Sequence, residues 1–180
     1  MKSRYARWLV MACLTAIPLL SACTGGNFHL RGKADLPVVF QTMMLQGLAI
    51  DSAFTLALRK AFENTGNELR LIPSADHQEE SLLYITNYQE GKRVVGYGKN
   101  REVREFLIFT RLDYEVRAKD GGILLPKQRL QVDKTQIYDS EFVLGKTEEE
   151  RLIREDLRDD LARQVLIRLR YGHPEAENTR

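Results

Sequence analysis

The sequence REFLIFTRLDYEVR, residues 104–117, is the most informative stretch of the chain for its architecture. Apolar and polar residues alternate along it, which is the pattern of a β-strand with one face on a core and the other in water. The apolar positions are Phe106, Ile108, Leu112, Tyr114 and Val116, and the polar ones are Arg111, Asp113, Glu115 and Arg117. Asp120-Gly121-Gly122 then predicts a tight connection, and residues 129–138 are expected to form an antiparallel partner strand.

Three more strands and one helix are predicted upstream of this pair. Residues 42–45 form a short apolar run that ends at Gly47, and residues 68–72 and 82–88 are two further strand candidates. Between the first two, apolar residues recur at helical spacing, with Asp51 or Ser52 placed to cap the start and Asn64-Thr65-Gly66 to end it. The helical apolar positions are Phe54, Ala57, Leu58, Ala61 and Phe62.

A long second helix is predicted near the C-terminus. Thr147 and Glu150 have the spacing of a capping box, and Gly172-His173-Pro174 is expected to end the helix. One apolar face is formed by Ile153, Leu157, Leu161, Val165 and Leu169. Two helices that bracket a run of strands predict an α+β fold, with both helices packed on one face of a mostly antiparallel four- to five-stranded sheet.

The N-terminus has the features of a bacterial lipoprotein signal. Basic residues precede a thirteen-residue apolar stretch, residues 8–20, which is too short to span a bilayer. Leu20-Ser21-Ala22-Cys23 follows with the pattern of a lipobox, so residues 1–22 are expected to be cleaved and Cys23 to carry the lipid anchor. An ordinary secretory signal with an incidental cysteine is the alternative. Thr24 stands where an aspartate often signals inner-membrane retention, so we expect anchoring on the periplasmic side of the outer membrane.

Cleavage also changes the charge balance of the chain. Loss of Lys2, Arg4 and Arg7 leaves 24 basic against 25 acidic residues, so no global basic field favours nucleic acid. Cys13 leaves with the signal, and Cys23 then has no disulfide partner. We expect a lipidated tether at residues 23–37, one domain at residues 38–171 and a polar tail at residues 172–180.

The sequence shows no pattern of catalytic, cofactor-binding or metal-binding residues. His29, His77 and His173 lie far apart, without metal-ligand spacing. Gly145-Lys146-Thr147 lacks the earlier glycine of a phosphate-binding loop, and Gly96-Tyr97-Gly98 lacks the third glycine of a dinucleotide site. A hydrolase would need a nucleophile with a visible base, and none is apparent. We therefore predict no enzyme activity and no cofactor.

Basic residues gather between two predicted strands. They are Lys92, Arg93, Lys99, Arg101 and Arg104, with Tyr97 among them. One interpretation is protection of strand edges against aggregation. The other is an anion site, because lysine and arginine suit phosphate groups.

The segment Phe28-His29-Leu30-Arg31-Gly32, shortly after Cys23, carries a family resemblance. Together with the order of strand, helix, strands and long C-terminal helix, it resembles the LptE (RlpB) family of lipopolysaccharide-assembly lipoproteins over the whole mature chain. Residues 24–27 lengthen the tether where many relatives have only a glycine. The resemblance implies a non-enzymatic protein that plugs the outer-membrane β-barrel LptD, helps it assemble and binds lipopolysaccharide. An unrelated lipoprotein that acts as an envelope scaffold is the alternative.

Two sets of site residues follow from this resemblance. Exposed aromatics on loops are natural partner contacts, so Tyr97 and Phe142 are predicted to contact the barrel. Lipid A phosphates need cations, so Lys99, Arg101 and Arg104, together with Lys146 on the loop before the last helix, are predicted to bind lipopolysaccharide. The two groups could converge if their loops lie at the same end of the sheet.

Overall fold

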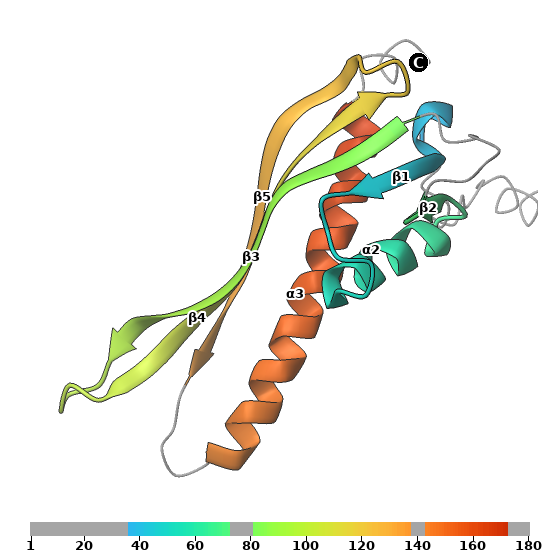
Figure 1. Cartoon of the computed structure of the whole chain (residues 1–180). Helices are drawn as coiled ribbons and strands as arrows, with labels where there is room; N and C mark the ends of the chain where they lie inside the picture. Colours follow the sequence, from blue (N-terminus) through green and yellow to red (C-terminus); the bar gives the residue numbers. More distant parts are fainter. Residues whose placement is uncertain (1–35, 73–80, 138–142, 173–180) are drawn as a thin grey trace, which may run out of the picture. The chain divides into compact units, whose positions relative to one another are not determined.

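The computed structural model describes residues 36–72, 81–137 and 143–172. The elements in chain order are η3 (Val38–Phe40), β1 (Thr42–Gln46), α2 (Ala53–Asn64), β2 (Glu68–Arg70), β3 (Ser81–Tyr97), β4 (Val103–Ala118), β5 (Ile123–Ile137) and α3 (Val143–Gly172). The five strands form one sheet in the order β2-β1-β3-β4-β5, and α2 and α3 lie on the same face of it (Figure 1). The predicted α+β class is confirmed.

The sheet has a parallel part and an antiparallel part. β1 runs parallel to both of its neighbours, β2 and β3, while β3, β4 and β5 form an antiparallel meander. Parallel neighbours require a crossover, and α2 supplies the crossover from β1 to β2. Gly47 starts this connection with φ +94°, and a Cβ there would lie 2.1 Å from the carbonyl oxygen of Ile85. Only glycine fits at this point.

The first helix forms where the sequence predicts it. The Ser52 side chain caps α2 by accepting a hydrogen bond of 3.1 Å from the amide of Thr55. Phe54, Leu58 and Phe62 are fully buried on one face of the helix. The packing of α2 against α3 and β2 therefore closes the core over the parallel part of the sheet.

The predicted core of the long hairpin and the last helix is also confirmed. The apolar face of α3 packs on β4 and β5. All five of its predicted residues are buried, as are four of the five predicted in β4: Ile153, Leu157, Leu161, Val165 and Leu169 in α3, and Ile108, Leu112, Tyr114 and Val116 in β4. Asp113, expected in water, is instead buried, because it accepts two hydrogen bonds of 2.6 and 2.9 Å from Arg129 of β5.

Three predicted boundaries are wrong. β3 continues to Tyr97, well past the expected end at residue 88, and β5 starts at Ile123 and not at residue 129. The first error arose because the basic residues from Lys92 onward were interpreted as a connection between two strands, whereas they continue β3. The expected capping box is also wrong, since α3 begins at Val143 and Thr147 and Glu150 lie inside it.

One row of side chains along α3 changes character halfway. Residues spaced by four lie on one side of a helix, and this row reads Glu150, Arg154, Arg158, Ala162 and Leu166. Its first three members form ion pairs with β3, whereas Ala162 and Leu166 are buried. The change coincides with the start of α2, where the ring of Phe54 stacks on that of Tyr88 in β3 at 4.6 Å. Where α2 covers this side of α3 the row is apolar, and beyond α2 it is charged.

Candidate functional site

The turn between β3 and β4 forms the far end of the long hairpin. The amide of Gly98 donates to the carbonyl of Glu102 at 2.8 Å, and the amide of Arg101 donates to the carbonyl of Gly98 at 3.0 Å. Arg101 has φ +64°, the left-handed conformation that closes a three-residue hairpin connection. A Cβ at Gly98 would lie 2.1 Å from a carboxylate oxygen of Glu102, so a larger residue here would displace the Glu102 side chain.

Lys99, Arg101 and Arg104 lie in or beside this turn, and all three are exposed. Arg104 donates to Glu102 at 3.2 Å, and Glu102 also accepts from the amide of Asn100 at 2.9 Å. Its own backbone amide, Arg104 and the Asn100 amide hold the pKa of Glu102 below its ordinary value. Within the residues that the structure describes, Lys99 and Arg101 have no ion-pair partner. These two cations are therefore available to an external anion.

Tyr97 is the last residue of β3, paired with Val103, and its side chain is 68% exposed. Val94 and Val95, just before it, are also exposed. We call residues 94–104 the hairpin tip. A two-stranded ribbon with exposed apolar side chains is a poor structure in isolation and a good surface for a partner. Phe142, the second predicted partner contact, and Cys23 both lie outside the described residues.

Lys146 lies in the first turn of α3, and not in a loop as predicted. Its ammonium group pairs with Glu149 at 2.9 Å, and its carbonyl accepts a hydrogen bond of 3.0 Å from Gln136 of β5. Gln136 is paired with Phe106, three residues from the start of β4 at Val103. At about 3.3 Å a residue, Lys146 is anchored roughly 10 Å before the start of β4, and the turn lies beyond that point.

The two predicted cationic groups thus lie at the same end of the sheet but do not form one cluster. Figure 1 shows the hairpin tip extending away from the start of α3. No contact joins Lys99 to Lys146 in the described part of the chain. Only an extended ligand could touch both groups together.

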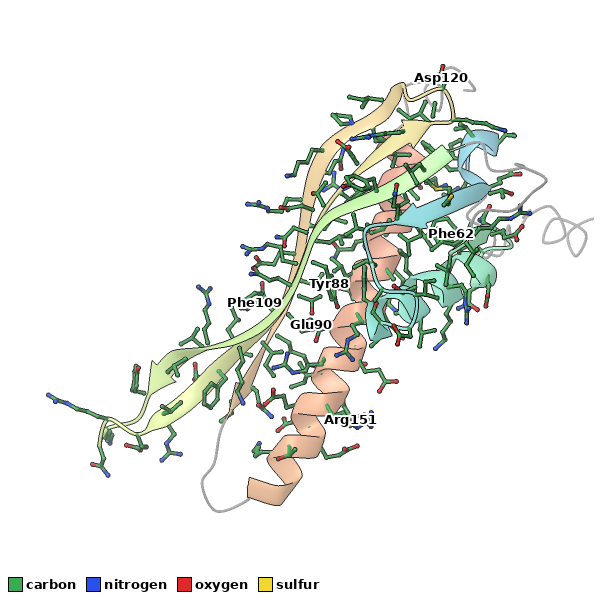
Figure 2. All side chains as sticks on the ribbon, viewed as in Figure 1. Phe62, Tyr88, Glu90, Phe109, Asp120 and Arg151 are labelled. Atoms are coloured by element: carbon green, nitrogen blue, oxygen red, sulfur yellow. The ribbon has the colours of Figure 1, made fainter. Side chains whose placement is uncertain are left out.

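Between the hairpin tip and the core lies a set of charged side chains that sequence reasoning did not identify. We call Glu90, Lys92, Glu150, Arg154 and Arg158 the ion-pair layer. Arg158 donates two hydrogen bonds to Glu90, at 2.7 and 2.8 Å, and Lys92 binds Glu150 at 2.6 Å. Tyr88 also donates to Glu90, and Figure 2 shows both side chains between the sheet and α3. The layer joins β3 to the first half of α3.

The pKa values reflect this arrangement. Burial alone would raise the pKa of Glu90, but Arg158, the Tyr88 hydroxyl and Arg154 outweigh it and hold the pKa below its ordinary value. Lys92 is the main cause of the lowered pKa of Glu150. Burial and the neighbouring Glu90 raise the pKa of Tyr88 well above its ordinary value. All the carboxylates of the layer are therefore ionised at neutral pH, and none is poised as a general acid.

The described residues contain no group of three or more His, Cys, Asp or Glu side chains in a metal-binding arrangement. Across the same ranges, none of the helices combines the length and apolar character needed to cross a bilayer. The described surface includes a charged, projecting hairpin (Figure 1).

Solved structures of bacterial lipoproteins share this fold. An uncharacterized lipoprotein B from Nitrosomonas europaea has a TM-score of 0.65 and 20% identity, over 82% of this chain and 92% of its own. A minor lipoprotein from Acinetobacter baumannii has a TM-score of 0.61 and 18% identity, over 76% and 95%. The rare lipoprotein B from Shewanella oneidensis has a TM-score of 0.55 and 13% identity, over 71% and 89%. This chain thus shares its fold with these three lipoproteins.

The sequence assigns the family more narrowly. Residues 40–169 match the family model described as LptE, lipopolysaccharide-assembly. The chain is also 21% identical over 150 residues to the LPS-assembly lipoprotein LptE of Pectobacterium atrosepticum, covering 81% of this chain and 77% of that protein. Because the match extends over most of the domain, the protein belongs to the LptE family, as its sequence predicts.

Proposed function

We propose that this protein is a non-enzymatic lipoprotein of the outer membrane that plugs and helps assemble an LptD-like β-barrel and binds lipopolysaccharide during its export. The observation that carries the proposal is the LptE family match over residues 40–169. In this proposal Cys23 carries the lipid anchor and the domain faces the periplasm.

The surface of the domain suits a plug. The lumen of an outer-membrane barrel is polar, so a protein inside it needs a charged surface with few apolar anchors. Exposed ion pairs cover the outer side of α3, where Arg151 binds both Glu148 and Glu155. The hairpin tip adds Tyr97 as an aromatic side chain of the kind that dominates interface energies.

Lipopolysaccharide binding is assigned to the cations of the same region. Lys99 and Arg101 are exposed and unpaired among the described residues, so they can meet lipid A phosphates without breaking an existing contact. Arg104 and Lys146 are each already paired with a carboxylate, Glu102 and Glu149, which partly offsets their charge toward a ligand. We therefore rank Lys99 and Arg101 above Arg104 and Lys146.

A detergent pull-down from cell envelopes tests the barrel partner. A tight 1:1 complex with a very large β-barrel, identified by mass spectrometry, is expected. Tyr97→Asp should weaken it, while Tyr171→Asp, a control at the opposite end of the domain with the same 68% exposure, should not. Recovery of a different envelope protein, with no barrel, would instead favour the scaffold alternative.

Direct binding measurements test the ligand. The double variant Lys99→Glu/Arg101→Glu should lose about 1 to 3 kcal/mol of lipopolysaccharide affinity for each charge-assisted bond removed. Lys99→Glu/Lys146→Glu should show a smaller loss, since Lys146 is already paired. Lys60→Glu/Lys127→Glu reverses two exposed charges elsewhere and serves as the control. Affinity equal to wild type in the first variant, at low salt, would exclude the hairpin tip as the binding site.

The anchor has its own test. Cys23→Ala should abolish labelling with fatty acid and block cleavage at this site, while the domain keeps its fold. Continued labelling of this variant would exclude Cys23 as the lipidated residue.

A further inference from the structure

Gln136 is a polar residue at a buried position of β5. It is 1% exposed, and the other buried residues of this strand are Leu125, Leu130 and Val132. Its side-chain nitrogen Nε2 donates two hydrogen bonds, but its oxygen Oε1 has no partner within the residues that the structure describes. A buried amide that is only partly hydrogen-bonded costs free energy. The stability of the core therefore does not explain why this position holds glutamine.

Both hydrogen bonds of Gln136 end at the first turn of α3. Nε2 donates to the backbone carbonyl of Lys146 at 3.0 Å and to Oε2 of Glu149 at 3.2 Å. The same Glu149 oxygen accepts a hydrogen bond from the ammonium group of Lys146 at 2.9 Å. Gln136 therefore holds Lys146 at two points, directly through its main chain and indirectly through the carboxylate that binds its side chain.

Lys146 lies where helix electrostatics disfavour a cation. The N-terminal end of a helix carries partial positive charge, yet Lys146 occupies the first turn of α3 with its side chain 24% exposed. Hydrogen bonds from Lys146 and then from Gln136 are the main causes that hold the pKa of Glu149 below its ordinary value. The Glu149 carboxylate is therefore ionised at neutral pH and keeps the ammonium group of Lys146 in place.

Pairing with Glu149 leaves binding capacity on Lys146. An ammonium group has three N–H donors, and Glu149 accepts from one of them. The other two have no protein acceptor among the described residues. A phosphate group can accept from these donors while the bond to Glu149 is kept. A lysine that is already ordered also loses less side-chain entropy when it binds.

We propose that Gln136 is a positioning residue for Lys146, holding its ammonium group ready for a phosphate of lipopolysaccharide. This inference rests on the lipopolysaccharide binding of the proposed function and adds a residue that acts on the ligand only through Lys146 and Glu149. Gln136 is too deeply buried to meet the ligand itself.

Gln136→Met tests this role, because methionine has a similar volume and shape but removes both hydrogen bonds. The affinity of the purified lipoprotein in detergent for lipopolysaccharide should fall several-fold. Its stability to urea should be unchanged or raised, since the unpaired Oε1 is removed and Glu149, 45% exposed, can bind water instead. Gln131→Met, the same change at an exposed position of β5, is the matched control and should alter neither quantity. Unchanged affinity in Gln136→Met, or a loss that only parallels a loss of stability, would overturn the proposal.

A double-mutant cycle shows whether Gln136 acts through Lys146. Lys146→Ala should lower the affinity at least as much as Gln136→Met, and combining the two should cause no further loss. Lipopolysaccharide stripped of its lipid A phosphates should bind wild type and Gln136→Met equally well. If Gln136→Met lowers the affinity equally with and without Lys146, the residue does not act through the lysine and the proposal is wrong.

NMR of lysines labelled with ¹³C at Cε separates this proposal from the proposed function. The Lys146 signal is assigned by its absence in Lys146→Arg. Gln136→Met should move it toward the signals of exposed lysines such as Lys60. An unmoved signal would overturn the positioning role, whatever the ligand. A signal that moves in a protein that does not bind lipopolysaccharide would support the hold of Gln136 on Lys146 and exclude the ligand of the proposed function.

Discussion

The two halves of α3 meet the rest of the domain in different ways. The C-terminal half packs between α2 and the sheet through buried apolar residues such as Leu161 and Leu166. On the side toward β3, the N-terminal half uses the ion-pair layer, in which Glu90 and Arg158 are 20% and 23% exposed. The difference arises because α2 packs on the C-terminal half of α3 and excludes water from it. The N-terminal half lacks this neighbour, so apolar side chains in the same row would be exposed to solvent. α3 therefore forms two kinds of interface, an apolar one where α2 packs on it and a charged one where α2 is absent.

The largest expected effect lies in the covered half. Phe62 of α2 is fully buried, so Phe62→Ala should leave a cavity and lower the free energy of unfolding by about 3 to 5 kcal/mol. Urea denaturation followed by circular dichroism measures this change. Leu56 of the same helix is 47% exposed. Leu56→Ala is therefore the control and should lower the free energy of unfolding much less.

The ion-pair layer should contribute less. Glu90→Ala removes the acceptor of Arg158 and Tyr88 in a partly solvated site, so a loss of about 1 to 3 kcal/mol is expected. Arg158→Ala should cost a similar amount, and the double variant less than the sum, because the two residues share one interaction. Additive losses in the cycle would show that the pair is not coupled. A loss as large as that of Phe62→Ala would remove the distinction between the halves.

Acid should loosen only the N-terminal half of α3. The folded pKa values of Glu90 and Glu150 are lowered, so their contribution to stability is present above the ordinary glutamate pKa of about 4.3. It is lost as pH falls through the lowered folded values. Amide hydrogen exchange, corrected for the intrinsic effect of pH, should show protection falling at residues 148–158 before residues 161–169. A uniform loss along the helix would argue against two different interfaces.

The smallest effect is expected at the hairpin tip. Arg101 adopts φ +64°, which glycine tolerates better, so Arg101→Gly should change stability by less than about 1 kcal/mol, in the stabilising direction. The same substitution removes a cation proposed to bind lipopolysaccharide. Unchanged or raised thermal stability together with weaker ligand binding would separate function from folding at this residue. A clear drop in melting temperature would show that the Arg101 side chain stabilises the turn.

Periodic patterns predicted most of the fold. Alternation identified β4, and helical spacing with Ser52 identified α2 and its cap. β3 was cut short because its second half is rich in polar and basic residues, which were interpreted as a connection between two strands. The ion-pair layer could not be found from sequence, since Glu90 and Arg158 are 68 residues apart and each looks like an ordinary surface residue. Lys99 and Arg101 were identifiable from local composition, whereas the pairing of Lys146 with Glu149 depended on where α3 begins.

The position of α3 at the end of the chain has a consequence for biogenesis. Synthesis proceeds from the N-terminus, so every strand of the sheet is made before the helix that covers β4 and β5. Until residues 153–169 arrive, the apolar face formed by Ile108, Leu112 and Val116 has nothing to bury it. Partly made chains are therefore vulnerable to aggregation. Folding of this domain is completed only once its last helix has been delivered.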